Sequence, residues 1–287
     1  AEVALRPSPA RRAALAAAAR RDRRLVLVYH RLGTPSSSDV VPVCPPAVFA
    51  SHLQVLADVA DVVPLPEIVA ASRQARPPVA LTFDDDEPSH VTEALPRLQA
   101  AGAPATFFLC GRALHGLGAP WWVRLERREA AAGGDPRGLA RRVEGTEAAA
   151  ALEVELDRAD DAVLDERGLA ALGRAGMGIG FHTVRHPVLT GLDDVDLDEA
   201  LRDGRGDLAD AAGTAVDTFA YPHGKTDLRV ASRTRDAGFV LACAGGPGSI
   251  DRRTDPWRIA RWEPPPVLGD RFAAMLAARL NAPVGGR

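Results

Sequence analysis

The chain has 287 residues, 46% hydrophobic and 25% charged, which is ordinary for a soluble globular protein and excludes disorder, collagen or coiled coil as a description of the whole chain. Lys and Arg number 35 against 38 Asp and Glu, a net charge of −3 that gives no electrostatic case for nucleic-acid binding. The 3 cysteines do not form a disulfide framework, and no apolar run is long enough to span a bilayer.

Short apolar runs alternate along the chain with longer stretches of helical spacing. Residues 1–24 are predicted to form a helical extension, since their Ala- and Arg-rich segment is too short and too weakly hydrophobic for a signal peptide. Strands are predicted at 25–30, 61–65, 78–85, 105–110, 178–183, 217–222 and 238–244. Because strands and helices alternate, we expect parallel β-α units, and about seven such units close a barrel.

One stretch breaks this alternation. Residues 121–174 contain no convincing strand and are rich in Ala, Arg and Glu, so we expect a helical insertion in one domain that spans residues 25–287. Trp121 and Trp122 open the insertion, and they either line a binding groove or anchor a helix. The predicted fold class is α/β, with strands that are buried on both faces.

Three polar clusters follow apolar strands, at the ends where α/β folds build their active sites. The first cluster is Asp84, Asp85 and Asp86. Three adjacent carboxylates repel one another, and a bound cation would compensate for that repulsion. The alternative is a solvated acidic cap at the start of the next helix.

The other two clusters contain histidines. His182 and His186 follow the run GIGF, and their spacing lets two imidazoles converge on one metal ion, whereas the alternative is an exposed turn before a proline. In the run AYPHG, Pro222 and Gly224 flank His223. Such a turn can aim a backbone N–H at a ligand, and the alternative is a plain strand-to-helix turn.

Together the clusters predict an Asp-His-His site for a divalent metal. Such sites serve zinc-type hydrolysis, with bound water as the nucleophile, and non-haem iron oxygenation. The oxygenase pattern places its first histidine and carboxylate close together, whereas here the acidic cluster lies about a hundred residues before the histidines. The cluster also offers a spare carboxylate, which hydrolysis needs as a general base. We therefore favour hydrolysis.

Five motifs in this order resemble the polysaccharide deacetylases, which are also called the NodB homology group or carbohydrate esterase family 4. They are YHR, LTFDD, APATFFL, IGFHTVRHP and FAYPHG, and the resemblance runs from about residue 25 to about residue 262. It implies a distorted (β/α)7 barrel, here with the helical insertion. It also implies removal of N-acetyl groups from amino sugars with a divalent metal, zinc first and Co²⁺ or Ni²⁺ as alternatives.

The resemblance implies a role for each matching residue. Asp84 would be the general base, and Asp85, His182 and His186 would bind the metal. In members with the FAYP form, the histidine on the first strand can supply the catalytic acid, so His30 would protonate the leaving amine. The alternative is a hydrogen-bonded structural histidine at the end of that strand.

Three further positions would contact the substrate, and the backbone N–H of one of them would hold the oxyanion. They are Tyr221, His223 and Trp257, and the backbone N–H is that of His223. Trp257 could stack on a sugar ring, and the alternative is that it packs in the core. Many family members have an arginine that orients the base where this chain has Ala220, and Arg258 and Arg261 are the candidates to replace it. The family commonly has Gly at position 86, and the aspartate here either raises the pKa of its neighbours or points away.

The expected reaction is hydrolysis of an N-acetyl group on an N-acetylhexosamine unit in a polymer, a lipid-linked sugar or a small glycoside. The alternatives are a non-sugar amide or cyclic amide hydrolase, and a degenerate sugar-binding module without catalysis. No nucleic-acid partner is expected, and the oligomeric state stays open. Because no leader is visible, we expect a cytoplasmic protein; the alternative is a secreted protein whose leader has been removed.

Overall fold

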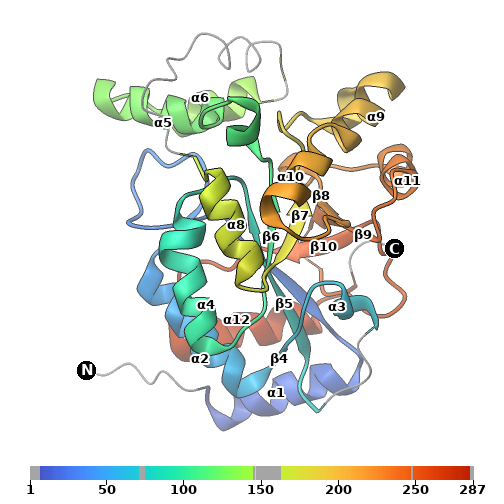
Figure 1. Cartoon of the computed structure of the whole chain (residues 1–287). Helices are drawn as coiled ribbons and strands as arrows, with labels where there is room; N and C mark the ends of the chain where they lie inside the picture. The colour runs from blue at the N-terminus through green and yellow to red at the C-terminus, as the bar shows by residue number, and fades with distance from the viewer. Residues whose placement is uncertain (1–6, 71–74, 145, 147–162, 247, 285–287) are drawn as a thin grey trace.

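The computed structural model describes residues 7–70, 75–144, 146, 163–246 and 248–284, and its centre is a ring of parallel strands (Figure 1). The ring contains β1 (Leu25–Tyr29), β5 (Pro78–Asp84), β6 (Thr106–Leu109), β7 (Gly178–Phe181), β8 (Thr218–Ala220), β9 (Leu241–Gly245) and β10 (Ile259–Trp262). Neighbours in this order are hydrogen-bonded from β5 to β10, and β1 pairs with both β10 and β5. The ring therefore closes, and the predicted (β/α)7 barrel is confirmed.

Two strands differ from the prediction. The segment predicted as a strand over 61–65 forms only the short β4 (Asp61–Val62), which pairs with the first residues of β5 on the edge opposite β1 and lies outside the ring. The seventh place belongs to β10, which the sequence does not indicate because it is short and a charged Arg261 interrupts its apolar run. That arginine is only 6% exposed. A two-stranded parallel sheet, β2 (Arg31–Leu32) with β3 (Val43–Cys44), lies beside the barrel.

Helices coat the outside of the ring (Figure 1). They are α1 (Pro9–Arg20), α2 (Pro46–Val59), the π-helical turn η1 (His90–Ala94) with α4 (Leu95–Ala101), α8 (Glu166–Arg174), α9 (Asp194–Arg202), α10 (Arg205–Ala212), α11 (Leu228–Asp236) and α12 (Gly269–Asn281). The short α3 (Glu67–Ala70) instead packs its Ile68 into the apolar cluster that fills the barrel. Short 3₁₀ turns are η2 (Arg112–His115), η3 (Leu189–Gly191) and η4 (Pro222–Gly224). The predicted N-terminal extension contains α1, which Ser8 caps and which packs on α12 through its buried face, so this helix belongs to the coat.

The predicted insertion is divided by the structure. The helices α5 (Trp121–Ala132) and α6 (Pro136–Val143) lie away from the coat, at the top of Figure 1. By contrast, α8 packs against β7 and α10 and is the coat helix that precedes β7. The part of the prediction over 147–162 lies outside the described residues. Among the helices that are described, none combines the length and the apolar composition that a bilayer span requires.

Alternation along the strands decides which side chains enter the barrel. On β5, Ala80 belongs to an inner apolar cluster, while Val79, Leu81 and Phe83 pack outward against the helices. The period of two therefore turns Asp84, the last residue of β5, inward at the carboxyl end of the ring. The same rule turns His30 inward after β1, whose Val26 belongs to the inner cluster.

Candidate metal centre and active site

A cavity of about 450 Å³ opens at the carboxyl end of the barrel. Its floor and walls, which we call the rim, come from the ends of the strands and the loops that follow them. Its cover, which we call the roof, comes from α5, α6 and residues 40–42. A small apolar cluster, separate from the barrel core, holds the roof together; it includes Trp121, Trp122, Leu125 and Ala140. Both tryptophans also line the cavity, so each interpretation given to them is true in part.

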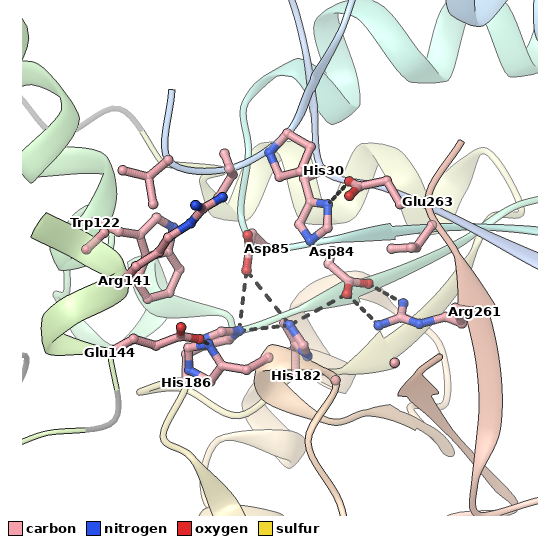
Figure 2. A pocket seen from close by; sticks show the side chains of 18 of the residues that line it. His30, Asp84, Asp85, Trp122, Arg141, Glu144, His182, His186, Arg261 and Glu263 are labelled. Atoms are coloured by element: carbon pink, nitrogen blue, oxygen red, sulfur yellow. Dashed lines mark hydrogen bonds and ion pairs between the residues drawn. The ribbon is translucent and has the colours of Figure 1, made fainter. Parts of the chain in front are cut away.

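Three side chains, which we call the metal triad, converge on one point: Asp85, His182 and His186 (Figure 2). The two histidine Nε2 atoms are 3.1 Å apart, and each is 3.8 Å from Asp85 Oδ1. Two nitrogen ligands of a tetrahedral zinc ion lie about 3.3 Å apart, since each Zn–N bond is close to 2.05 Å. These separations fit a divalent cation.

The surroundings of the triad also fit a metal. The Nδ1–H of His182 donates to the backbone carbonyl of Ala220 at 2.8 Å, which leaves the Nε2 lone pair available to a ligand bond. Burial lowers the pKa of His182 to about 4 and that of His186 well below its usual value, so both imidazoles are neutral, as metal ligands must be. Asp85 Oδ1 is buried without a hydrogen-bond partner among the described residues, and burial raises the pKa of this carboxyl to about 7. A cation would satisfy that oxygen.

The backbone is strained at this site. In the described part of the chain, 5 non-glycine residues have a left-handed backbone, and 4 of them lie here: Asp85 (φ 71°), Thr183 (φ 61°), His186 (φ 53°) and His223 (φ 59°). Each such residue costs on the order of 1–3 kcal/mol, and such strain gathers at functional sites. The Thr183 hydroxyl accepts the His186 backbone N–H at 3.1 Å and so holds the turn that presents this ligand.

Asp84 forms a bidentate ion pair with Arg261 beside the triad. Both guanidinium Nη atoms donate to the carboxylate, one to each oxygen, at 2.6 Å. Burial raises the pKa of Asp84, but the charge and hydrogen bonds of Arg261, together with the charges of His182 and His30, outweigh burial and lower the pKa to about 2. Asp84 Oδ2 lies 3.8 Å from Nε2 of His182. The structure therefore presents a charged carboxylate next to the triad, as a general base requires.

His30 carries a proton on the same cavity wall (Figure 2). Its Nδ1–H donates to Glu263 Oε1 at 3.0 Å. Burial lowers the pKa of His30, but the hydrogen bond and charge of Glu263, with the charges of Asp84 and Asp85, raise it to about 9. His90 is buried, and its Nε2–H donates to the backbone carbonyl of His30 at 3.1 Å, which helps to fix the position of His30. His30 is thus placed and charged as a proton donor.

His223 lies against the triad, with its ring centroid 4.5 Å from that of His186, and its Nδ1 forms an ion pair with Glu144. Glu144 closes the C-terminal end of α6, so this ion pair joins the rim to the roof. The neighbouring position must be glycine, because a Cβ on Gly224 would lie 2.7 Å from the backbone of Gly245. This tight approach holds the turn that presents the His223 backbone.

Three predicted residues lie elsewhere. Trp257 and Arg258 precede β10 and so lie at the amino end of the barrel, opposite the cavity; the Trp257 indole N–H donates to the Phe239 carbonyl at 2.9 Å. The predictions that Trp257 contacts substrate and that Arg258 orients the base are therefore wrong. Tyr221 is 0% exposed and its hydroxyl donates to the Trp257 carbonyl at 2.8 Å, so its predicted substrate contact is also wrong.

Asp86 points away from the triad. Its carboxylate accepts the backbone N–H groups of Cys110 (2.8 Å), Gly111 (3.2 Å) and Arg112 (2.8 Å), directly after β6. Burial raises the pKa of Asp86, and these hydrogen bonds oppose that effect. The residue that departs from the family pattern therefore stabilises the loop after β6 and does not enter the cavity.

Sequence reasoning missed Glu263, Glu144 and the roof arginines Arg137 and Arg141, all of which line the cavity. A signal for Glu263 exists, since it follows Arg261 by two residues and extended chain places both on one face. Arg137, Arg141 and Glu144 lie on α6 or at its end and do not directly follow a strand, so their spacing carries no comparable signal.

Comparisons with known proteins agree with the geometry. The solved structures that resemble the chain include the deacetylase PplD of Streptococcus pyogenes, in complex with acetate (17% identity, TM-score 0.67, 91% of this chain and 99% of that chain). They also include IcaB of Ammonifex degensii (20%, 0.63, 91% and 98%) and the polysaccharide deacetylase BC0361 of Bacillus cereus (16%, 0.62, 90% and 69%). At these identities the likeness shows the fold alone. A search of curated protein sequences finds no match. The profile of the polysaccharide deacetylase family matches residues 71–242, more than half of the chain, and the chain therefore belongs to this family.

Proposed function

We propose that the protein is a zinc-dependent hydrolase that removes the N-acetyl group from an N-acetylhexosamine unit. Membership of the polysaccharide deacetylase family supports deacetylation of a sugar. The observation that carries the mechanism is the meeting of the metal triad with the Asp84–Arg261 pair in one cavity. A site that only bound sugar would need neither a strained triad nor a charged buried carboxylate beside it.

Each residue of the cavity has its own role in the hydrolysis. When bound to the triad, a divalent cation supplies polarisation of the acetyl carbonyl and a water molecule of lowered pKa. Asp84 accepts the proton of the attacking water, and Arg261 keeps this carboxylate ionised and fixed in direction. The backbone N–H of His223 stabilises the oxyanion of the tetrahedral intermediate. His30 then donates its proton to the leaving amine, which departs as the free amino sugar.

The test is acetate release by the full chain from chito-oligomers, N-acetylglucosaminyl lipids and small N-acetylated glycosides. Each is assayed with added Zn²⁺, with Co²⁺ or Ni²⁺, and with a chelator. We expect acetate release that the chelator abolishes and Zn²⁺ restores. A metal-loaded protein that releases no acetate from any sugar but opens cyclic amides would overturn the proposal in favour of a non-sugar amide hydrolase.

A further inference from the structure

Two arginines of the roof line the cavity from one face of α6. Arg137 and Arg141 are four residues apart, so they lie one above the other on the helix, and both line the cavity. In Figure 2 the Arg141 side chain extends beside Trp122 toward the interior of the cavity. Like charges at this spacing repel, so the helix places two positive charges together without a benefit of its own.

Every acidic side chain in the cavity wall already has basic neighbours. The neighbours are Arg261 for Asp84, His30 for Glu263, His223 for Glu144, and the two triad histidines for Asp85. Lys225 also lies 3.9 Å from Glu144. Arg261 and the protonated His30 offset the charges of Asp84 and Glu263, and Lys225 lies near Glu144. A divalent cation at the triad would offset Asp85, so the charge of the wall is then balanced without the roof arginines.

The two roof arginines have no such balance within the described residues, where no carboxylate lies within 4.0 Å of either guanidinium. Arg137 donates its Nε–H to the backbone carbonyl of Asp39 at 2.8 Å, which holds the side chain but leaves its charge uncompensated. Both side chains are exposed to solvent at the cavity. The described residues therefore give the cavity an excess of positive charge on one side, opposite the reacting groups of the rim.

We propose, on the basis of the function proposed above, that Arg137 and Arg141 bind an anionic group of the substrate. The guanidinium fork matches the two oxygens of a phosphate or a carboxylate, and such charge-assisted hydrogen bonds are among the strongest in proteins. The substrate class is then an N-acetylated amino sugar that carries a phosphate or lies beside a uronic acid. With a neutral N-acetylhexosamine chain in the cavity, both charges of the roof would have no anionic partner among the described residues.

The helix end offers another reason for an arginine at position 141, because cations in a last turn interact favourably with the helix dipole. Arg142 occupies the same turn, is exposed and does not line the cavity. It therefore shares the dipole effect without the proposed contact, and Arg142→Gln is the matched control for Arg141→Gln.

The experiment measures kcat/KM for acetate release by the zinc-loaded full chain from three kinds of substrate: triacetylchitotriose, N-acetylglucosamine 1- and 6-phosphates, and hyaluronan oligosaccharides. We expect Arg141→Gln to lower kcat/KM for one of the two anionic kinds by about 10-fold to 100-fold and for chitotriose by less than about twofold. Arg141→Lys should retain part of the activity, and Arg142→Gln should change neither value. The kind of anionic substrate that responds separates phosphate from carboxylate.

A binding measurement tests the anion site independently of the deacetylase reaction. Calorimetric titration of the same proteins with N-acetylglucosamine phosphates and with hyaluronan oligosaccharides should show weaker binding to Arg141→Gln than to Arg142→Gln. If the chain binds these compounds in an Arg141-dependent manner but releases no acetate from any sugar, the proposed function fails and the anion site stands. If acetate is released and Arg141→Gln affects neutral and anionic substrates equally, the anion site fails and the deacetylase stands.

Discussion

The rim and the roof of the cavity are built in opposite ways. Rim side chains project from or just after the barrel strands, are largely buried, and pair with one another over short distances, as Asp84 and Arg261 do at 2.6 Å. The roof consists of two helices held by a small apolar cluster, with exposed arginines on its inner face. Buried, mutually paired groups suit proton transfer and metal binding, whereas exposed charges at the mouth suit the choice of substrate.

Two contacts between these regions reach the metal triad or the residue against it. The ring of Trp122, from the roof, lies 4.8 Å from that of His186, and Glu144 pairs with His223. Each contact links the roof to a residue in or against the metal triad. If chemistry belongs to the rim and substrate choice to the roof, changes in the rim should abolish turnover and changes in the roof should alter KM and selectivity.

The largest effect is expected for His182→Ala. This change removes one of three ligands whose donor atoms all lie within 4.8 Å of one another, so zinc binding should be lost. Acetate release should fall by more than about 100-fold. Mutation of a residue that only hydrogen-bonds to a metal ligand costs up to about 100-fold, and loss of the ligand itself should cost more. Zinc content of the purified protein is the measurement. His115→Ala is the control, since this histidine does not line the cavity, and an undiminished zinc content in His182→Ala would refute the ligand assignment.

Asp84→Asn should retain zinc and lose turnover. The amide cannot accept the proton of water, and loss of a general base costs about 10²-fold to 10⁴-fold in kcat. The change also leaves the buried Arg261 without its counter-ion, so the free energy of unfolding should fall by about 3–5 kcal/mol. Metal analysis, acetate release and denaturant unfolding are measured on one preparation. Full activity with zinc in place would mean that the base is another residue.

Glu263→Gln should shift the alkaline limb of the pH profile. Because the pKa of His30 is raised to about 9 and the protonated form is the acid, kcat/KM should be constant at neutral pH and fall as the pH rises through about 9. Without the Glu263 charge the pKa of His30 is lower, so the fall in kcat/KM should begin at lower pH. Near pH 9, kcat/KM of the variant should be about 10-fold below its own value at neutral pH. An unchanged limb would return His30 to a structural role.

The rim could be predicted largely from the sequence because strand ends in a parallel barrel meet at one edge. Asp84, Asp85, His182 and His186 each follow an apolar run, and that position alone brings them together. Arg261 could not be separated from Arg258, because the sequence does not show where β10 begins. The bounds of β10 show that Arg258 precedes the strand, whereas Arg261 lies within it and its guanidinium reaches Asp84 in the cavity.

Other predictions were wrong or missing because they depend on which side of the barrel sheet a side chain faces and on tertiary packing. Ala220 belongs to the inner apolar cluster of the barrel and Tyr221 to the outer one, so the tyrosine of the motif points away from the cavity. In the described part of the chain, the roof helices contribute no strand to the barrel sheet, so no strand periodicity predicts that Arg141 and Glu144 reach a site formed by residues far away in the sequence.

Glu144→Gln is expected to have the smallest effect. The carboxylate is 34% exposed, and ion pairs of this kind are worth up to about 1 kcal/mol, so KM should rise about twofold to fivefold with kcat within about twofold of the parent. Glu129→Gln is the control, since Glu129 lies on α5 outside the cavity wall. A 10-fold fall in kcat at constant KM would mean that Glu144 acts through His223 on the reacting groups. The roof would then take part in the chemistry, and the division between the two regions would fail at the ion pair that joins them.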